Sequence, residues 1–157
     1  GGHVAQRRIP PLITAGAAPM VIPREWVAHR LGLKPVARLV ATAAHAQAPD
    51  KFTSAPVPAV RKLLELARWE PGDVDLYEVN EAFACVAMIA MRDLDISRDR
   101  LNVHGGATAL GHPIGASGAR LMATLISALE QQGTRRGVAT LCIGGGEATA
   151  VAVELIY

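Results

Sequence analysis

Segments with the period of a β-strand alternate with segments with the period of a helix along this chain of 157 residues. The expected strands are 37–44, 74–79, 101–104, 137–143 and 148–156, and the expected helices are 24–32, 56–70, 81–94 and 116–129. This alternation predicts an α/β fold with right-handed crossovers. We expect a mixed, mostly parallel sheet of five strands with helices on its faces. The last strand should run antiparallel, because residues 144–147 predict a tight hairpin.

Two regions stand apart from this pattern. Residues 1–24 contain four prolines and no sustained period, so we expect an irregular segment with only a short strand at 17–22, followed by a domain over 25–157. In the predicted helix 116–129 the one charged residue is Arg120. A helix that is apolar nearly all round is buried on most sides, so we expect something outside this chain to cover it.

Composition excludes several classes of protein. Half of the residues are hydrophobic and the net charge is +2, which argues against disorder and against binding driven by nucleic-acid phosphates. No apolar run approaches the roughly 18 residues of a membrane span. The two cysteines cannot build a disulfide framework, and no secretion signal is visible, so we expect a cytoplasmic location.

The Asn-Glu-Ala-Phe stretch at 80–83 follows a predicted strand, where ligands gather in open α/β sheets. In the simplest interpretation Asn80 caps a helix and Glu81 suits the positive end of its dipole. In the functional interpretation the amide of Asn80, fixed between strand and helix, orients a water molecule or a substrate oxygen.

The glycine-rich stretch 105–118 lacks the Gly-Lys-Ser/Thr ending of a phosphate-binding loop and the glycine spacing of a dinucleotide site. His112 lies between Gly111 and Pro113, and the proline keeps the histidine out of the helical conformation. An imidazole presented in this way can act as a base or a hydrogen-bond donor near neutral pH. The alternative is a histidine with a purely structural role.

Cys142 is followed by three glycines, Gly144 to Gly146, after Ile143. Most free cysteines are small buried hydrophobic residues, but the glycines expose backbone N–H groups of the kind that form an oxyanion hole. A thiol beside such a turn can act as a nucleophile or as an acid and base. Cys85 is expected to be structural, and no residue spacing indicates a metal site.

Together, three stretches resemble the signatures of the thiolase C-terminal domain: 80–83, 105–120 and 142–146. They occur in the order found in that family. The resemblance covers residues 35–157 and, more loosely, 15–34. It implies a thiolase-type half, in an enzyme that cleaves 3-oxoacyl-CoA with CoA or condenses two acetyl-CoA molecules through an acyl-cysteine.

The resemblance also implies roles for individual residues. His112 would activate the acylated cysteine and help to bind the thioester oxygen, and Asn80 would hold the water that completes this oxyanion site. Cys142 would shuttle the proton to and from the CoA sulfur or the acetyl α-carbon. The N–H of Gly144 would contribute to a second oxyanion hole. Two further residues would lie against the pantetheine arm of the substrate: Ala82 and Phe83.

In that family the nucleophilic cysteine lies in an N-terminal half, and neither Cys85 nor Cys142 has its motif. We therefore expect this chain to be inactive alone and to need an N-terminal half and a loop domain. The other implied partners are acyl-CoA and CoA as substrates, with no cofactor or metal, and further copies in a dimer or tetramer. The alternative is a non-catalytic module that binds acyl-CoA or a partner chain.

Overall fold

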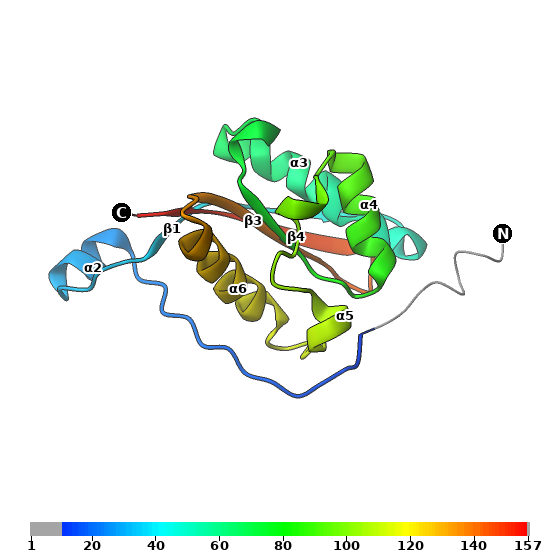
Figure 1. The fold of residues 1–157 in the computed structure, drawn as a ribbon, viewed down its shortest axis with the longest axis horizontal. Helices are drawn as coiled ribbons and strands as arrows, with labels where there is room; N and C mark the ends of the chain where they lie inside the picture. Colours follow the sequence, from blue (N-terminus) through cyan, green and yellow to red (C-terminus); the bar gives the residue numbers. More distant parts are fainter. Residues whose placement is uncertain (1–10, 157) are drawn as a thin grey trace.

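A computed structural model describes residues 11–156, whose strands form one mixed sheet in the order β1-β4-β3-β2 (Figure 1). The strands are β1 Ala37–Ala46, β2 Leu76–Val79, β3 Arg136–Cys142 and β4 Glu147–Leu155. The helices are α2 Glu25–Arg30, α3 Pro56–Ala67, α4 Ala84–Leu94, α5 Ala107–Leu110 and α6 Ser117–Gln132. Short 3-10 turns lie at η1 Pro49–Ser54, η2 Pro71–Asp73 and η3 Arg98–Arg100.

Strands β1, β2 and β3 run in one direction and β4 runs against them. β3 pairs in parallel with β2, with Val79 opposite Thr140, while β4 pairs antiparallel with both β3 and β1. The prediction of a mixed sheet with an antiparallel last strand is therefore confirmed. Because β4 lies between β1 and β3, it separates the two strands that would otherwise continue the parallel part of the sheet.

The described part of the chain has four strands, and the predicted fifth strand at 101–104 is wrong. Leu101 makes an isolated bridge to Tyr77, and Asn102 then enters the left-handed region with a φ of +48°. The side chain of Asn102 takes the place of a strand: its oxygen accepts a hydrogen bond from the N–H of Val79 at 2.8 Å. Its nitrogen donates to the carbonyl of Val79 at 2.9 Å. A side chain thus satisfies backbone groups that a fifth strand would pair.

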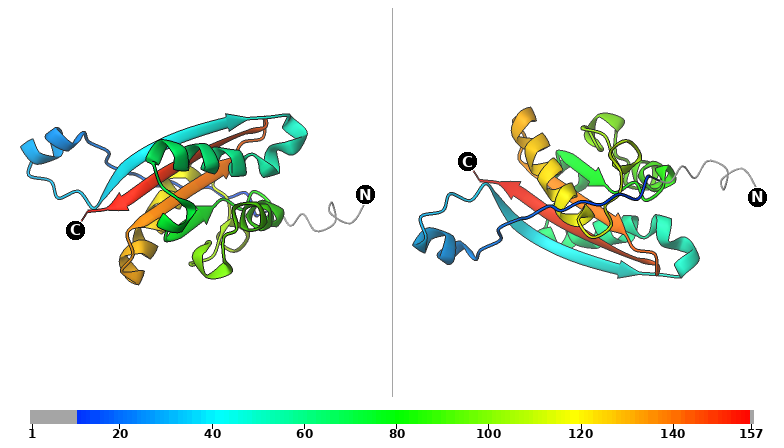
Figure 2. Two further views of the ribbon diagram at one scale, coloured as in Figure 1. Left: turned by 90° about the horizontal axis from the view of Figure 1, so that it is seen from above. Right: turned by 90° about the horizontal axis from the view of Figure 1, so that it is seen from below.

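Helices α3 and α4 cover one face of the sheet and α6 covers the other, so the domain has three layers (Figures 1 and 2). Leu63 of α3 and Val86 of α4 lie in the core on the first face. Leu121 and Leu125 of α6 lie in a second core on the opposite face. The two cores share no side chain, because successive residues of a strand point to opposite faces.

Helix α6 buries one side against the sheet and leaves small residues such as Gly118 and Ala123 exposed on the other. The expectation of a helix covered on most sides is therefore met on its sheet side only. A cavity of about 920 Å³ lies next to α6, between Met122 and Ile126 and the residues around Val21 and Leu39.

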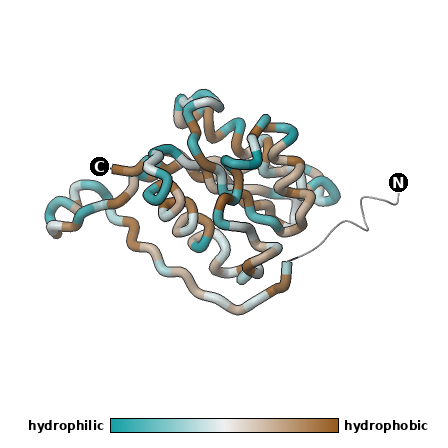
Figure 3. The backbone as a smooth tube through the Cα atoms, viewed as in Figure 1, coloured by the Kyte–Doolittle hydropathy of each residue, from teal (hydrophilic) through white to brown (hydrophobic). Residues whose placement is uncertain are grey.

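Residues 11–24 run as an extended segment along the α6 side of the domain, and Figure 3 shows much of this segment as hydrophobic. Residues 1–10 of the predicted irregular segment lie outside the described residues. The predicted strand at 17–22 is wrong, because the described segment pairs with the rest of the domain through one bridge, from Ile13 to His112. Val21 is 84% exposed and has no sheet neighbour here. The predicted helix that follows is confirmed as α2.

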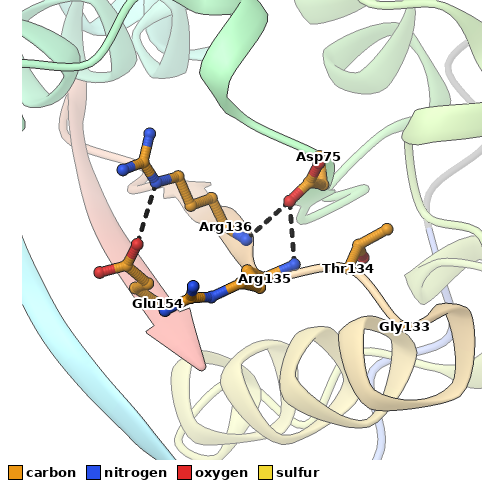
Figure 4. Close-up of a pocket in the computed structure, with 6 residues that line it drawn as sticks. All are labelled: Asp75, Gly133, Thr134, Arg135, Arg136 and Glu154. Atoms are coloured by element: carbon orange, nitrogen blue, oxygen red, sulfur yellow. Dashed lines mark hydrogen bonds and ion pairs between the residues drawn. The ribbon is translucent and has the colours of Figure 1, made fainter. Parts of the chain in front are cut away.

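At the amino end of β3, Asp75 forms hydrogen bonds with the turn that connects α6 to β3 (Figure 4). One of its carboxylate oxygens accepts hydrogen bonds from the backbone N–H groups of Arg135 and Arg136, at 2.9 and 2.8 Å. Arg136 also donates to Glu154 at 3.0 Å. These bonds fix this end of the sheet, which lies opposite the end that carries the sequence motifs.

The predicted hairpin is confirmed as the tight turn between β3 and β4. The N–H of Gly146 donates to the carbonyl of Ile143 at 3.0 Å, and the carbonyl of Gly146 accepts from the N–H of Gln47 at 3.0 Å. Gly146 has a φ of +99°, and a Cβ at this position would overlap the backbone oxygen of Gln47. The turn therefore requires glycine at 146.

We expect Gly146→Ala to lower the free energy of unfolding by about 2–4 kcal/mol, from backbone strain and overpacking together. Gly144→Ala is the matched control, because a Cβ there would meet nothing within 4 Å. It should change the stability by less than about 0.5 kcal/mol. Urea unfolding of the two variants measures this difference, and equal midpoints would contradict the assignment.

Candidate active site

Two motif residues lie at the same edge of the sheet, where the parallel strands β2 and β3 end. Asn80 directly follows β2, and its N–H donates to the carbonyl of Thr140 on β3 at 2.9 Å. Cys142 is the last residue of β3. The carboxyl ends of neighbouring parallel strands thus place both residues on one rim, as the sequence predicts.

The structure brings His112 to Asn80 over 32 residues of sequence. The side-chain nitrogen Nδ2 of Asn80 lies 3.5 Å from Nε2 of His112, and Asn80 is fully buried. The backbone of His112 is held by the extended N-terminal segment: its N–H donates to the carbonyl of Leu12 at 2.8 Å. Gly111 permits this approach, because its φ is +93° and a Cβ there would lie 2.8 Å from the Thr14 side chain.

Ser117, at the start of α6, fixes the other side of the imidazole. Its Oγ lies 2.6 Å from Nδ1 of His112 and donates to the carbonyl of Pro113 at 3.0 Å. With the single hydroxyl hydrogen assigned to Pro113, Ser117 accepts from an N–H at Nδ1. This tautomer leaves a lone pair on Nε2, facing Asn80. The sequence analysis missed Ser117, although its place one helical turn after the Gly-His-Pro stretch was a usable signal.

The imidazole of His112 is suited to accept a proton. Burial lowers its pKa below the ordinary value, and the nearby positive charge of Arg120 lowers the pKa further. The lowered pKa favours the neutral ring at pH 7, and its Nε2, which faces the amide of Asn80, can then act as a base.

Glu81 does not begin a helix, and the interpretation of Asn80 as a helix cap is wrong. Helix α4 begins at Ala84, and its N-cap is Phe83, without a capping side chain. The carboxylate of Glu81 instead accepts hydrogen bonds from Nδ2 of Asn102 at 3.2 Å and from the N–H of Thr108 at 2.9 Å. It anchors the glycine-rich loop beside the end of β2.

Ala82 and Phe83 are half-buried between β2 and α4, where both pack against the core on the α3 side. The ring of Phe83 meets Phe52 edge to face, with centroids 5.9 Å apart. Their contact with a pantetheine arm stays a prediction.

Cys142 reaches the same rim from the other face of the sheet. Its side chain lies in the core with Leu63 and Val86, whereas His112 and Asn80 lie on the α6 side. Among the described residues no hydrogen bond joins its thiol to either of them. Burial raises the pKa of Cys142 to about 11, so the thiol is protonated at neutral pH. Such a group is an acid that gives its proton to a stronger base.

Gly144 is exposed in the turn after Cys142, and its N–H has no hydrogen-bond partner within residues 11–156. A free backbone N–H beside a thiol is able to hold a negatively charged oxygen. In this part of the chain no three His, Cys, Asp or Glu side chains gather as a metal site requires. No helix described here is long and apolar enough to cross a membrane.

A buried ion pair lies beneath the site, and the sequence analysis did not identify it. Oε2 of Glu78 on β2 lies 3.4 Å from Nη1 of Arg120 on α6, and Glu78 is 1% exposed. Burial raises the pKa of Glu78 to about 7; the cation of Arg120 opposes this rise and the carboxylate of Glu81 adds to it. A carboxylate two residues before Asn80, on the same strand face, was the available signal.

The raised pKa of Glu78 predicts a stability that falls as the pH rises. Between the ordinary value of 4.5 and the folded value of about 7, the folded chain binds more protons than the unfolded chain. The contribution is complete below pH 4.5 and is lost by about pH 7, a difference of about 3 kcal/mol. Urea unfolding across this range should show the decline, and Glu78→Gln should flatten it. Equal slopes in the two proteins would contradict the shift.

Residues 33–155 match the family model described as thiolase, C-terminal domain. The chain belongs to the thiolase family. The resemblance stated from the three motifs is therefore confirmed.

Relatives of this thiolase domain include an acetyl-CoA acetyltransferase of Allochromatium vinosum, 50% identical over 90% of the chain and 36% of the relative. The cytosolic acetyl-CoA acetyltransferase of Mus musculus is 44% identical over 88% of the chain and 35% of the relative. The crystal structure of the Bacillus anthracis acetyl-CoA acetyltransferase superposes with a TM-score of 0.81 and 41% identity, over 84% of the chain and 34% of that protein. The thiolase domain described here thus spans about a third of the length of these relatives.

Proposed function

We propose that this chain is the C-terminal domain of an acyl-CoA acyltransferase of the thiolase type. The enzyme would cleave 3-oxoacyl-CoA with CoA, or condense two acetyl-CoA molecules, through an acyl-cysteine on an N-terminal half. The observation that carries this proposal is the Asn80–His112–Ser117 chain of contacts, which leaves a basic Nε2 at the rim that also holds Cys142. The relatives named as acetyl-CoA acetyltransferases support the same reaction class.

In the first step Nε2 of His112 would take the proton of the nucleophilic thiol, whose sulfur then attacks the thioester carbonyl. The new N–H at Nε2 would donate to the thioester oxygen as negative charge develops there. Asn80 would hold the water that shares this oxygen. Oδ1 of Asn80 is buried and has no partner among the described residues, so it is available to bind that water.

In the second role, Cys142 would give its proton to the departing CoA sulfur. The resulting thiolate would recover a proton from the acetyl α-carbon in the condensation direction, and the N–H of Gly144 would contribute to the second oxyanion hole. With a pKa of about 11, the thiol is protonated at neutral pH and so holds the proton that this step requires. Ala82 and Phe83 would lie against the pantetheine arm.

The proposed partners are acyl-CoA and CoA as substrates, an N-terminal thiolase half, and further copies in a dimer or tetramer. We propose no cofactor beyond the CoA thioester itself. A cytoplasmic location suits two cysteines that are both free thiols.

Acetoacetyl-CoA cleavage tests the proposal. The 157 residues should show no turnover alone and should gain turnover when co-expressed with the N-terminal part of a relative such as the Allochromatium vinosum protein. Robust turnover by the chain alone would refute the proposal that the nucleophilic cysteine lies on a separate N-terminal half. A co-purifying pair with no turnover would refute the enzymatic proposal.

The second candidate is a module that binds acyl-CoA without turnover. The observation that favours it is the thiol of Cys142, which faces the α3 side while His112 lies on the α6 side. CoA binding by the co-purified pair, without cleavage, is the result that this candidate predicts.

A further inference from the structure

Two contacts join β2 to the first turns of α6. Glu78 and Asn80 are two residues apart on β2 and its end, so their side chains share the α6 face. Ser117 and Arg120 are three residues apart on α6, so they share one side of the helix. Glu78 meets Arg120 at 3.4 Å, and Asn80 meets Ser117 through the imidazole of His112.

The Arg120 contact is enclosed rather than solvated. Its side chain is 18% exposed, and the atoms Nε and Nη2 have no partner among the described residues. Oε1 of Glu78 is equally buried and also lacks a described partner. A pair that is enclosed in this way has little freedom to rearrange, so it fixes the distance between strand and helix.

We propose that Arg120 is a positioning residue for His112. By pairing with Glu78 it holds the first turns of α6 against the end of β2, which keeps Ser117 at Nδ1 and leaves Nε2 aimed at Asn80. The inference deepens the proposed function, on which its catalytic meaning rests. The arrangement itself is a property of this chain and is measurable without substrate.

The charged groups around the imidazole are few. Arg120 of α6 acts on His112 directly, and the carboxylate of Glu81 after β2 acts on that of Glu78 on β2. Removing the guanidinium therefore has two expected effects on His112. The ring loses its fixed tautomer, and its pKa rises.

The experiment is long-range ¹H–¹⁵N NMR of the histidine rings in the ¹⁵N-labelled 157-residue chain, with His112→Gln to assign the signal. In the unaltered chain we expect a protonated Nδ1, an unprotonated Nε2 and a pKa below the ordinary value. Arg120→Met should raise the pKa and average the two tautomers. Arg120→Lys keeps the positive charge but not the planar shape of the guanidinium. Compared with Arg120→Met, we expect it to recover the low pKa of His112 more fully than the Nδ1-protonated tautomer.

Arg92→Met is the matched control, because Arg92 is exposed on α4 and pairs with its neighbour Asp93. It should leave the His112 signal unchanged. An unchanged tautomer and pKa in folded Arg120→Met would overturn the proposal. If Arg120→Met does not fold, Glu78→Gln decides in its place, since it keeps the carboxyl shape and removes the ion pair. A protonated Nε2 in the unaltered chain would also overturn it, whatever the variants do.

Activity of the paired halves separates this inference from the proposed function. An inactive pair with the expected His112 signal would refute the enzyme and leave the positioning role standing. In an active pair, Arg120→Lys should lower kcat with little change in KM, because Arg120 would act on the substrate only through His112. A change in KM alone would contradict the positioning role.

Discussion

Replacing Cys142 with alanine is expected to slow the exchange of acetyl-CoA α-hydrogens with solvent by about 10²–10⁴-fold in the assembled protein. The proposed proton relay depends on this thiol, whose pKa of about 11 makes its thiolate a stronger base than that of an ordinary cysteine. Deuterium incorporation, followed by mass spectrometry, measures the exchange. Acylation of the nucleophile by acetyl-CoA should slow as well, since Cys142 would also protonate the departing CoA sulfur.

Cys85→Ala is the control for this experiment. Cys85 is the other cysteine of the chain and is half-buried in α4, so removing it tests for a general effect of losing a thiol. Exchange should continue in this variant. Unaltered exchange in Cys142→Ala would reject the role assigned to Cys142.

Replacing Asn102 with alanine should be the most destabilising change outside the reacting groups, at about 2–5 kcal/mol. The substitution leaves the buried N–H and C=O of Val79 without hydrogen-bond partners, each at a cost of about 1–3 kcal/mol. It also leaves a residue with a Cβ at a φ of +48°. Urea unfolding of the 157-residue chain measures the loss.

Asn102→Gly separates the two causes. Glycine accepts the left-handed backbone but cannot bond to Val79, so this variant should recover only about 1 kcal/mol. A glycine variant as stable as the unaltered chain would show that the hydrogen bonds to Val79 contribute nothing.

Periodicity predicted the main elements because packing and local preference agree in them. Strands β3 and β4 alternate small and branched residues on both sides of a glycine turn, and α3 places apolar residues at helical spacing. The prediction of a strand at 101–104 was wrong because residues distant in the sequence decide the conformation there. Nothing local indicates that Asn102 will bond to the backbone of Val79 across 23 residues.

The same distinction separates the predicted and missed parts of the site. The sequence predicts Asn80 and Cys142 at one rim because Asn80 follows a strand and Cys142 ends one, and the α/β pattern implies the direction of both strands. Which face each side chain takes depends on strand pairing, so the position of Cys142 opposite His112 required the structure. Ser117 and Glu78 were missed because their roles exist only once α6 packs on β2.

The backbone of His112 is held by a hydrogen bond to Leu12 and by a bridge to Ile13. Both residues belong to the extended segment 11–24, which has few other hydrogen bonds to the domain. The order of the imidazole therefore depends on residues about a hundred positions earlier in the same chain. A substitution at residue 12 or 13 would disturb the reactive ring without altering any side chain that surrounds it.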